Sequence, residues 1–143
     1  MQPADLDEIA AIELESPSSW KRAELEQELW RRDDLQLAAV DETSGEIVGW
    51  CCGRRVGAEA ELLKISVPRT RRRSGIAFAL IERLIWEFSA TGVEVLYLEV
   101  RAGNAPALQF YHNHGFKMTG LRKKYYTDPE DDALVFTKTL RKY

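Results

Sequence analysis

The chain has 143 residues, a formal net charge of −3 and a sequence pI near 5.5. Its composition, 45% hydrophobic and 30% charged, is that of one globular domain, which we assign to residues 1–143. The acidic pI argues against direct nucleic-acid binding. No apolar run reaches the ~18 residues of a membrane-spanning helix, and the acidic N-terminus is unlike a signal peptide. We therefore expect a soluble, cytoplasmic protein with no membrane partner, either a monomer or a weak dimer.

The only two cysteines, Cys51 and Cys52, are neighbours in an apolar segment with the length of a strand. Consecutive strand residues point to opposite faces of a sheet, so the two thiols are expected to be buried separately and to stay reduced. Adjacent cysteines have neither the spacing of a zinc site nor the number needed for a disulfide framework. We therefore predict no metal site.

Hydrophobic spacing predicts two helices and then three strands in the first half of the chain. Apolar residues recur at helical intervals over residues 5–15 and again over 21–32, with a turn at Pro17, Ser18 and Ser19 between them. The period then shortens to that of strands, and a Ser-Gly turn joins the first two strands as a hairpin. The predicted strands cover residues 36–41, 47–55 and 59–67.

The second half predicts a strand, a helix and a strand that cross over within one sheet, followed by a short helix and a hairpin. Residues 75–90 form the strongest helical pattern of the chain, which Gly92 ends. A nearly continuous apolar strand follows over 93–100, as in the centre of a sheet. Asn104 can cap a helix over 105–114. The last predicted strands, 116–122 and 133–140, are joined by a long acidic connection, and the whole is a mixed α/β sheet.

The segment from Val67 to Ala77 leads from a strand end through a basic loop into the strong helix. Free N–H groups at a helix start, together with the positive end of its dipole, favour a phosphate group, and Gly75 permits a close approach to the main chain. Arg72 and Arg73 would add positive charge, whereas Arg69 and Arg71 are interpreted as solvated charges. The loop is not a nucleoside triphosphate-binding P-loop, because no Gly-Lys-Ser/Thr follows.

This turn, Arg72-Arg73-Ser74-Gly75-Ile76-Ala77, resembles the Gln/Arg-x-x-Gly-x-Gly/Ala signature of the GNAT family of N-acetyltransferases. The downstream matches resemble the branch of that family that acetylates protein N-termini. They are Leu98-Glu99-Val100-Arg101, Asn104, Phe110-Tyr111, Gly115-Phe116, Tyr125-Tyr126 and the Asp131-Asp132-Ala133-Leu134-Val135 run. The resemblance implies the GNAT fold, a mixed central sheet flanked by helices with splayed fourth and fifth strands, here 59–67 and 93–100. The usual first strand of the family has no room before Asp5.

The resemblance also implies acetyl-CoA as co-substrate, bound in the opening between the two splayed strands. Main-chain groups of the first splayed strand would pair with pantetheine, and an N–H near Val67 would serve as oxyanion donor. The basic loop would surround the pyrophosphate. The implied cofactor-binding residues are Ile65, Ser66, Val67, Arg72, Arg73, Ser74, Gly75, Ile76, Ala77, Phe78 and Asn104.

Direct attack of an amine on a thioester needs two proton transfers, and the resemblance implies Glu99 as general base and Tyr111 as general acid. On the residues alone, Glu99 could equally be an outward-facing strand carboxylate, and Tyr111 a core aromatic residue. His112 and His114 are interpreted as surface or helix-end residues, because no carboxylate partner is evident.

By the same resemblance, Trp20, Tyr125 and Tyr126 bind the acceptor, and the acidic connection after Tyr126 suits a peptide with a basic second residue. The implied acceptor is the N-terminal α-amine of a protein, with ribosomal proteins as candidates. Two alternatives stay open: an acetyltransferase for a small amine or a lysine side chain, and a non-catalytic acyl-CoA-binding module.

Overall fold

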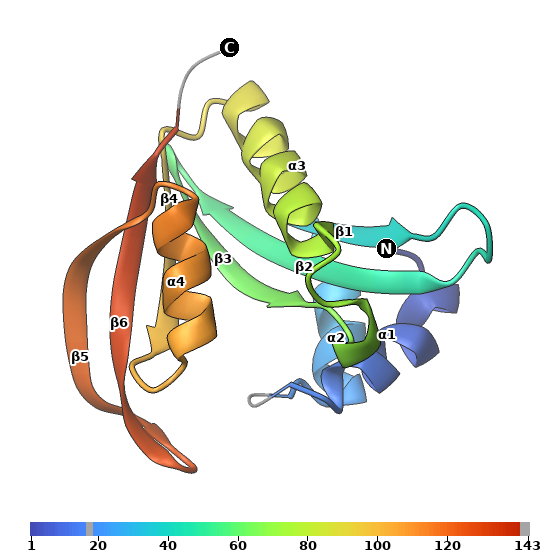
Figure 1. Ribbon diagram of the computed structural model, residues 1–143. Helices are drawn as coiled ribbons and strands as arrows, with labels where there is room; N and C mark the ends of the chain where they lie inside the picture. Colours follow the sequence, from blue (N-terminus) through green and yellow to red (C-terminus); the bar gives the residue numbers. More distant parts are fainter. Residues whose placement is uncertain (17–18, 141–143) are drawn as a thin grey trace.

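The computed structural model describes residues 1–16 and 19–140, so the predicted turn at Pro17 and Ser18 lies outside the described residues. The predicted order of helices and strands is confirmed (Figure 1). In chain order the elements are η1 (Pro3–Asp5), α1 (Leu6–Glu13), α2 (Arg22–Leu29), β1 (Asp34–Val40), β2 (Ile47–Val56), β3 (Glu59–Ser66), η2 (Arg69–Arg71), α3 (Ile76–Ala90), β4 (Val95–Arg101), α4 (Ala105–Asn113), β5 (Lys117–Thr127) and β6 (Glu130–Thr139).

The predicted long acidic connection between the last two strands is wrong. Strand β5 extends to Thr127 and β6 starts at Glu130, so most of that segment is paired strand. Two of its carboxylates stabilise the hairpin: Asp131 accepts a hydrogen bond from the Gly103 N–H at 3.0 Å, and Asp132 accepts one from the Lys124 N–H at 2.9 Å. At the other end, residues 3–5 form a short 3-10 helix rather than a strand.

The six strands form one mixed sheet in the order β1-β2-β3-β4-β6-β5. All neighbouring strands are antiparallel except β3 and β4, which are parallel and are connected through α3. A parallel pair needs such a crossover connection, and here the crossover brings the basic loop next to the end of β3.

Strands β3 and β4 pair only at their beginnings, between Glu59–Glu61 and Val95–Tyr97. Beyond Glu61, β3 continues along β2, whereas β4 keeps its pairing with β6 up to Arg101. The two strands therefore diverge, as Figure 1 shows, and the main-chain groups of β3 on its β4 side lose their ladder partners. This fork is the splay that the family resemblance implied.

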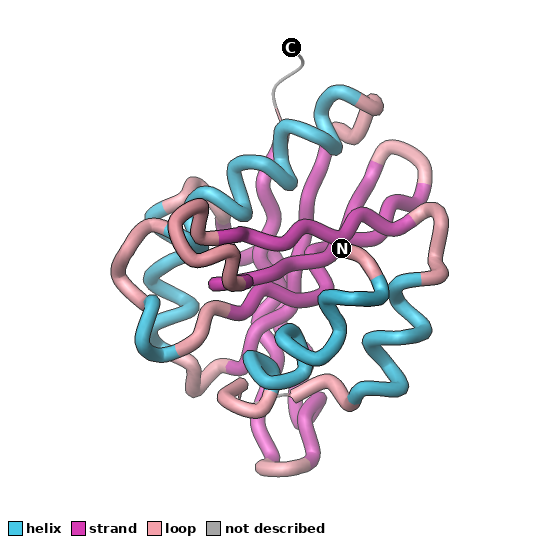
Figure 2. Tube along the Cα trace, turned by 90° about the vertical axis from the view of Figure 1, so that its right-hand side faces the viewer, coloured by secondary structure: helices cyan, strands magenta, loops and turns pink. Residues whose placement is uncertain are grey.

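Helices cover both faces of the sheet (Figure 2). Helices α3 and α4 bury one face in a core that includes Cys51, and α1 and α2 bury part of the other face in a second core that includes Cys52. The prediction that the two thiols point to opposite faces is thus confirmed, and burial raises the pKa of Cys51 to about 12. None of the helices among residues 1–16 and 19–140 is long and apolar enough to cross a membrane.

A buried carboxylate in α2 is expected to make folding stability depend on pH. Burial, with a hydrogen bond to Asp34, raises the pKa of Glu28 to about 7. The folded state therefore binds a proton that the unfolded state releases, so this contribution to stability is complete below about pH 4.5 and is lost as pH rises through about 7. We expect the melting temperature to fall between about pH 5.5 and pH 8.

The Glu28→Gln variant is expected to flatten this pH dependence. A glutamine amide can donate to Asp34 as the protonated acid does, and Gln36 can still donate to its carbonyl oxygen. Thermal unfolding of both proteins across this pH range measures the difference. An unchanged slope in the variant would show that another group titrates.

Candidate active site

The basic loop ends in two left-handed residues that shape the start of α3. Arg73 has φ 63° and Gly75, the N-cap residue, has φ 81°, a conformation that glycine adopts without cost. Gly75 has no side chain to accept a hydrogen bond from the first turn, and the first N–H groups of an α-helix lack intrahelical partners. The N–H groups of Ile76, Ala77 and Phe78 are therefore placed to bind an anion.

Of the four arginines of the loop, one is half-buried in ion pairs and three are exposed. Arg71 is half-buried and pairs with Asp41 at 3.1 Å and Glu46 at 3.6 Å, so its interpretation as a solvated charge is wrong. Arg69 is exposed, as expected, and its main-chain N–H donates to Glu15. Arg72 and Arg73 are exposed beside the start of α3. These two arginines are thus placed to add positive charge to the anion site.

Close packing brings the start of α3 against the end of β3. A Cβ atom at Gly49 in β2 would lie 2.9 Å from Ile76 Cγ2 and 3.3 Å from the main-chain oxygen of Ser66, so only glycine permits this approach. Ile65 and Val67 pack against the α3-side core, whereas the Ser66 hydroxyl points to the opposite face. The predicted pantetheine and pyrophosphate contacts are therefore contiguous.

Glu99 lies on the face of the sheet opposite to α3 and α4, because its neighbours Leu98 and Val100 are buried in the α3-side core. Its side chain is 15% exposed and pairs with Arg122 of β5, with 3.3 Å between Oε1 and Nε. The charge of Glu99, then burial and a hydrogen bond to Glu99, raise the pKa of the Tyr125 hydroxyl. Glu99 is thus a partly accessible carboxylate two residues beyond the last β4 residue that pairs with β3.

Tyr111 lies in α4 on the other side of the sheet and is buried among the rings of Phe110, Phe116 and Phe136. Burial raises the pKa of its phenol. Electrostatic effects of Cys51 and Tyr126 raise the pKa further. The side chain has the location of a core aromatic residue on the α4 side of the sheet.

The remaining predicted site residues lie in different parts of the fold. Asn104 caps α4 as predicted, its Oδ1 accepting from the Ala107 N–H at 3.3 Å. Arg101 stacks on Tyr126 with 4.2 Å to the ring centroid and donates to the main-chain oxygens at the β5–β6 turn. Trp20 packs edge-on against Trp50 on the α1 side. Trp20 and Tyr125 therefore belong to opposite halves of the forked sheet.

The two histidines lie at the end of α4. His112 is exposed, as predicted. His114 is the C-cap residue of α4, a helix-end position as predicted, and is half-buried, with its ring 4.9 Å from that of Phe78 and 4.4 Å from that of Phe110; burial lowers its pKa. Phe78, one of the predicted cofactor-binding residues, thus connects the first turn of α3 to α4.

Sequence reasoning missed Glu13, the last residue of α1, which is fully buried. Its carboxylate lies between Trp50, Ser66, Lys64 and the main chain of Trp20. The signal that could have found it was its position four residues after Ile9, on the apolar side of the helix, where a charge is rare.

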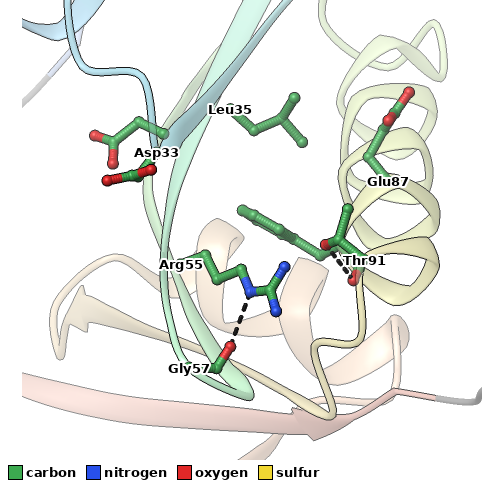
Figure 3. A pocket seen from close by; sticks show the side chains of 8 residues that line it. Asp33, Leu35, Arg55, Gly57, Glu87 and Thr91 are labelled. Atoms are coloured by element: carbon green, nitrogen blue, oxygen red, sulfur yellow. Dashed lines mark hydrogen bonds between the residues drawn. The ribbon is translucent and has the colours of Figure 1, made fainter.

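A cavity of about 450 Å³ lies away from these residues, between β1, the end of β2 and the end of α3 (Figure 3). Arg55 in its wall donates to the Gly57 carbonyl oxygen. None of the predicted site residues lines it. Its lining residues are Asp33, Asp34, Leu35, Arg55, Gly57, Glu87, Phe88 and Thr91.

A forked mixed sheet, with an anion-binding helix start beside the fork and a carboxylate and a phenol on its two faces, has the architecture implied for acyl-CoA-dependent transferases. The Acetyltransferase (GNAT) family model matches residues 6–116, and the chain belongs to this family. The chain is 38% identical over 94 residues to the [Ribosomal protein bS18]-alanine N-acetyltransferase of Escherichia coli K12. That match spans 64% of this chain and 64% of the relative's length.

Two solved structures have the same fold over nearly the whole chain. The crystal structure of the ribosomal-protein-S18-alanine N-acetyltransferase from Escherichia coli superposes with a TM-score of 0.88 at 29% identity, covering 98% of this chain and 90% of that one. Arabidopsis thaliana NAA60 in complex with acetyl-CoA superposes with a TM-score of 0.85 at 23% identity, covering 97% and 95%. At this identity, the similarity to NAA60 shows a shared fold only.

Proposed function

We propose that this protein is an acetyl-CoA-dependent N-acetyltransferase that acetylates the N-terminal α-amine of a protein, with a ribosomal protein as the leading candidate acceptor. The observation that carries the proposal is the fork between β3 and β4, with Glu99 just beyond it on one face of β4 and Tyr111 buried in the core on the other face of the sheet. The names of the relatives support the α-amine as acceptor, and the bS18 relative supports a ribosomal substrate.

Acetyl-CoA enters this proposal as a substrate held by the loop and by β3. Arg72, Arg73 and the N–H groups from Ser74 to Phe78 would bind the pyrophosphate, since they combine positive charge with a helix start. The main chain of residues 65–67 would pair with pantetheine, because β3 has lost its β4 partner there. Asn104 would contact the cofactor further in. The thioester would then lie in the fork.

The reaction proposed for this site is direct attack without an acyl-enzyme intermediate. An α-amine has a pKa of ~7.7–8.0, so part of it must lose a proton before the nitrogen can form a bond to the acetyl carbonyl carbon. Glu99 would accept the amine proton, directly or through water, and an N–H near Val67 would stabilise the oxyanion. When the C–S bond breaks, Tyr111 would donate its proton to the thiolate of CoA. The products are the acetylated amine and CoA.

In this mechanism Glu99 and Tyr111 would act from opposite faces of the sheet. Amine and base would meet on the face that carries Glu99, Tyr125 and Tyr126, whereas the departing sulfur would meet the phenol from the α4 side. The acceptor peptide would then lie between Trp20 and the β5–β6 hairpin. The carboxylates of Asp131 and Asp132 bind main-chain N–H groups, and Glu130 lies 4.0 Å from Lys124 Nζ, so Asp128 and the exposed Glu130 would be the groups that attract a basic second residue, Glu130 in competition with Lys124.

The proposed function predicts acetylation of free α-amines in preference to other amines. The protein would be incubated with acetyl-CoA and peptides starting with Ala or Ser, including one with the N-terminus of the host's own bS18, and thiol release and product mass would be measured. Matched peptides with a blocked N-terminus and an internal lysine, free amino acids and polyamines are the controls. If the protein acetylated the blocked lysine peptide or a polyamine but no peptide with a free α-amine, the proposed acceptor would be contradicted.

A further inference from the structure

Glu13 is a buried carboxylate surrounded by hydrogen-bond donors from three parts of the chain. Its Oε1 accepts from the Trp50 indole N–H at 2.8 Å and from the Ser66 hydroxyl at 2.9 Å. Its Oε2 accepts from the Trp20 main-chain N–H at 3.0 Å and lies 3.3 Å from Lys64 Nζ. The side chain is 0% exposed, and that of Lys64 is 10% exposed. The carboxylate thus has a complete, directed set of partners.

These partners connect the two predicted substrate subsites. Trp20 belongs to the segment between α1 and α2, where the acceptor would bind, and the hydroxyl of Ser19 in the same segment donates to the main-chain oxygen of Glu13. Ser66 is the last residue of β3, where the pantetheine would pair. One side chain therefore sets the distance between the acceptor segment and the strand that holds the thioester.

Only a carboxylate satisfies this set of partners. Three of the four are donors that cannot accept, namely the Trp50 indole, the Trp20 main-chain N–H and the Lys64 ammonium group. In the Glu13→Gln variant, whichever position the new NH₂ group occupied would face at least one of these donors. A buried donor facing another donor repels it and leaves both unsatisfied. The network would open at Trp20, at Trp50 or at Lys64.

Glu28 is the other buried glutamate among the described residues, and its partners differ from those of Glu13. It is also buried, but Asp34 beside it can accept a hydrogen bond from it. A glutamine at position 28 can therefore be satisfied where a glutamine at position 13 cannot. Glu28 lies beside β1 and the Arg54 end of β2, and its partners Asp34, Gln36 and Arg54 include none of the predicted site residues.

We propose that Glu13 is a positioning residue, which fixes the acceptor segment at Trp20 against the cofactor strand at Ser66 and so aligns the amine with the thioester. The inference rests on the proposed function, and it goes beyond it by assigning the alignment of the two substrates to a residue that touches neither. Glu13→Gln should therefore impair use of the acceptor more than binding of CoA, because the cofactor contacts proposed for β3 come from the main chain.

The test compares Glu13→Gln with wild type by steady-state kinetics, by CoA binding measured by calorimetry without acceptor, and by amide hydrogen exchange. We expect KM for the acceptor peptide to rise by about tenfold or more, and the Kd for CoA to change by less than about threefold. At least one of the two N–H groups bound to Glu13, the Trp20 main-chain amide or the Trp50 indole, should exchange at least about tenfold faster, with the α3 amides unchanged. Trp50→Phe, which removes a single donor, should give a smaller change in the same direction.

Two control variants separate alignment from general loss of stability. Glu28→Gln should leave both KM values unchanged. Leu84→Ala, in the α3-side core, should lower the melting temperature by at least a few degrees without changing the ratio of acceptor KM to CoA Kd. Glu13→Gln kinetics that match those of Leu84→Ala, or an equal loss of CoA binding and acceptor use, would overturn the inference.

Hydrogen exchange and CoA binding do not depend on the acceptor's identity. If wild-type protein acetylated no peptide α-amine, the proposed function would fail by itself. Unchanged exchange of both the Trp20 amide and the Trp50 indole N–H in Glu13→Gln would instead overturn the role of Glu13, whatever the wild-type activity.

Discussion

Replacing Glu99 with glutamine is expected to lower kcat by about 10²–10⁴-fold while the affinity for CoA stays unchanged. The amide keeps the size of the carboxylate and can still accept a hydrogen bond from Tyr125, but it cannot take a proton from the attacking amine. Because Glu99 lies on the face opposite to α3 and the basic loop, its loss should not affect the cofactor contacts. Single-turnover acetylation of an Ala-starting peptide and calorimetry with CoA measure the two quantities.

Glu61 is the matched control for this experiment. It is a neighbouring carboxylate on β3, and burial, with the charge of Glu99, raises its pKa. Glu61→Gln should change kcat by less than about threefold, because Glu61 lies within the paired part of β3, before the fork. A large loss of rate in Glu61→Gln together with wild-type rate in Glu99→Gln would assign the base to Glu61.

Local periodicity predicts the elements whose environment is regular along the chain. The apolar row on α3 predicted a helix with one buried face, whereas β4, predicted from its nearly continuous apolar sequence to be a strand of the sheet centre, is fully buried only on its α3 side and half-buried on the other. Alternation along β2 placed Cys51 and Cys52 in different cores. In each case the burial of a residue follows from the spacing of apolar residues close to it in the sequence, so a short stretch of sequence is enough to predict it.

Strand β5 could not be delimited in this way. It is an edge strand whose residues are exposed along almost its whole length, so no alternation of polar and apolar residues marks its end. Its pairing with β6 is irregular between Arg122 and Tyr126, where Lys124 has a positive φ of 52°. The acidic residues of β6 therefore looked like a loop, although two of them bind main-chain N–H groups of the hairpin and of the segment after β4.

The missed parts of the candidate site depend on contacts between distant segments. Arg71 of the basic loop forms a hydrogen bond with Asp41, which is 30 positions away in the sequence. Trp50 and Ser66 donate hydrogen bonds to Glu13 and are 37 and 53 positions away from it. No spacing rule relates such positions. The motif residues Gly75, Glu99 and Tyr111 and the splay of the two strands came from a family pattern, whereas the residue at which β3 and β4 part, Glu61, is a property of strand pairing and is given only by the structure.

Replacing Tyr111 with phenylalanine is expected to lower kcat by about 10²–10⁴-fold with little change in stability or in CoA affinity. Phenylalanine keeps the ring contacts with Phe110, Phe116 and Phe136, so the variant removes only the hydroxyl. An ordinary phenol has a pKa of ~10 and a thiol one of ~8.5, so proton donation to the thiolate is unfavourable in water. Burial raises the pKa of the phenol, and burial of the sulfur would raise the pKa of the CoA thiol in the same direction, so the proton transfer would depend on both groups being shielded from water.

The raised pKa of the Tyr111 phenol adds a prediction about pH. The active form of the acid is the protonated one, and burial keeps it protonated above its usual range. In wild-type protein, kcat should therefore show no decline from loss of this proton below about pH 10. Tyr97 lies on β4, on the face of the sheet opposite to α4, and Tyr97→Phe is the matched control. This variant should keep the wild-type rate. Wild-type turnover by Tyr111→Phe in a single-turnover assay would mean that water or another group protonates the leaving thiolate.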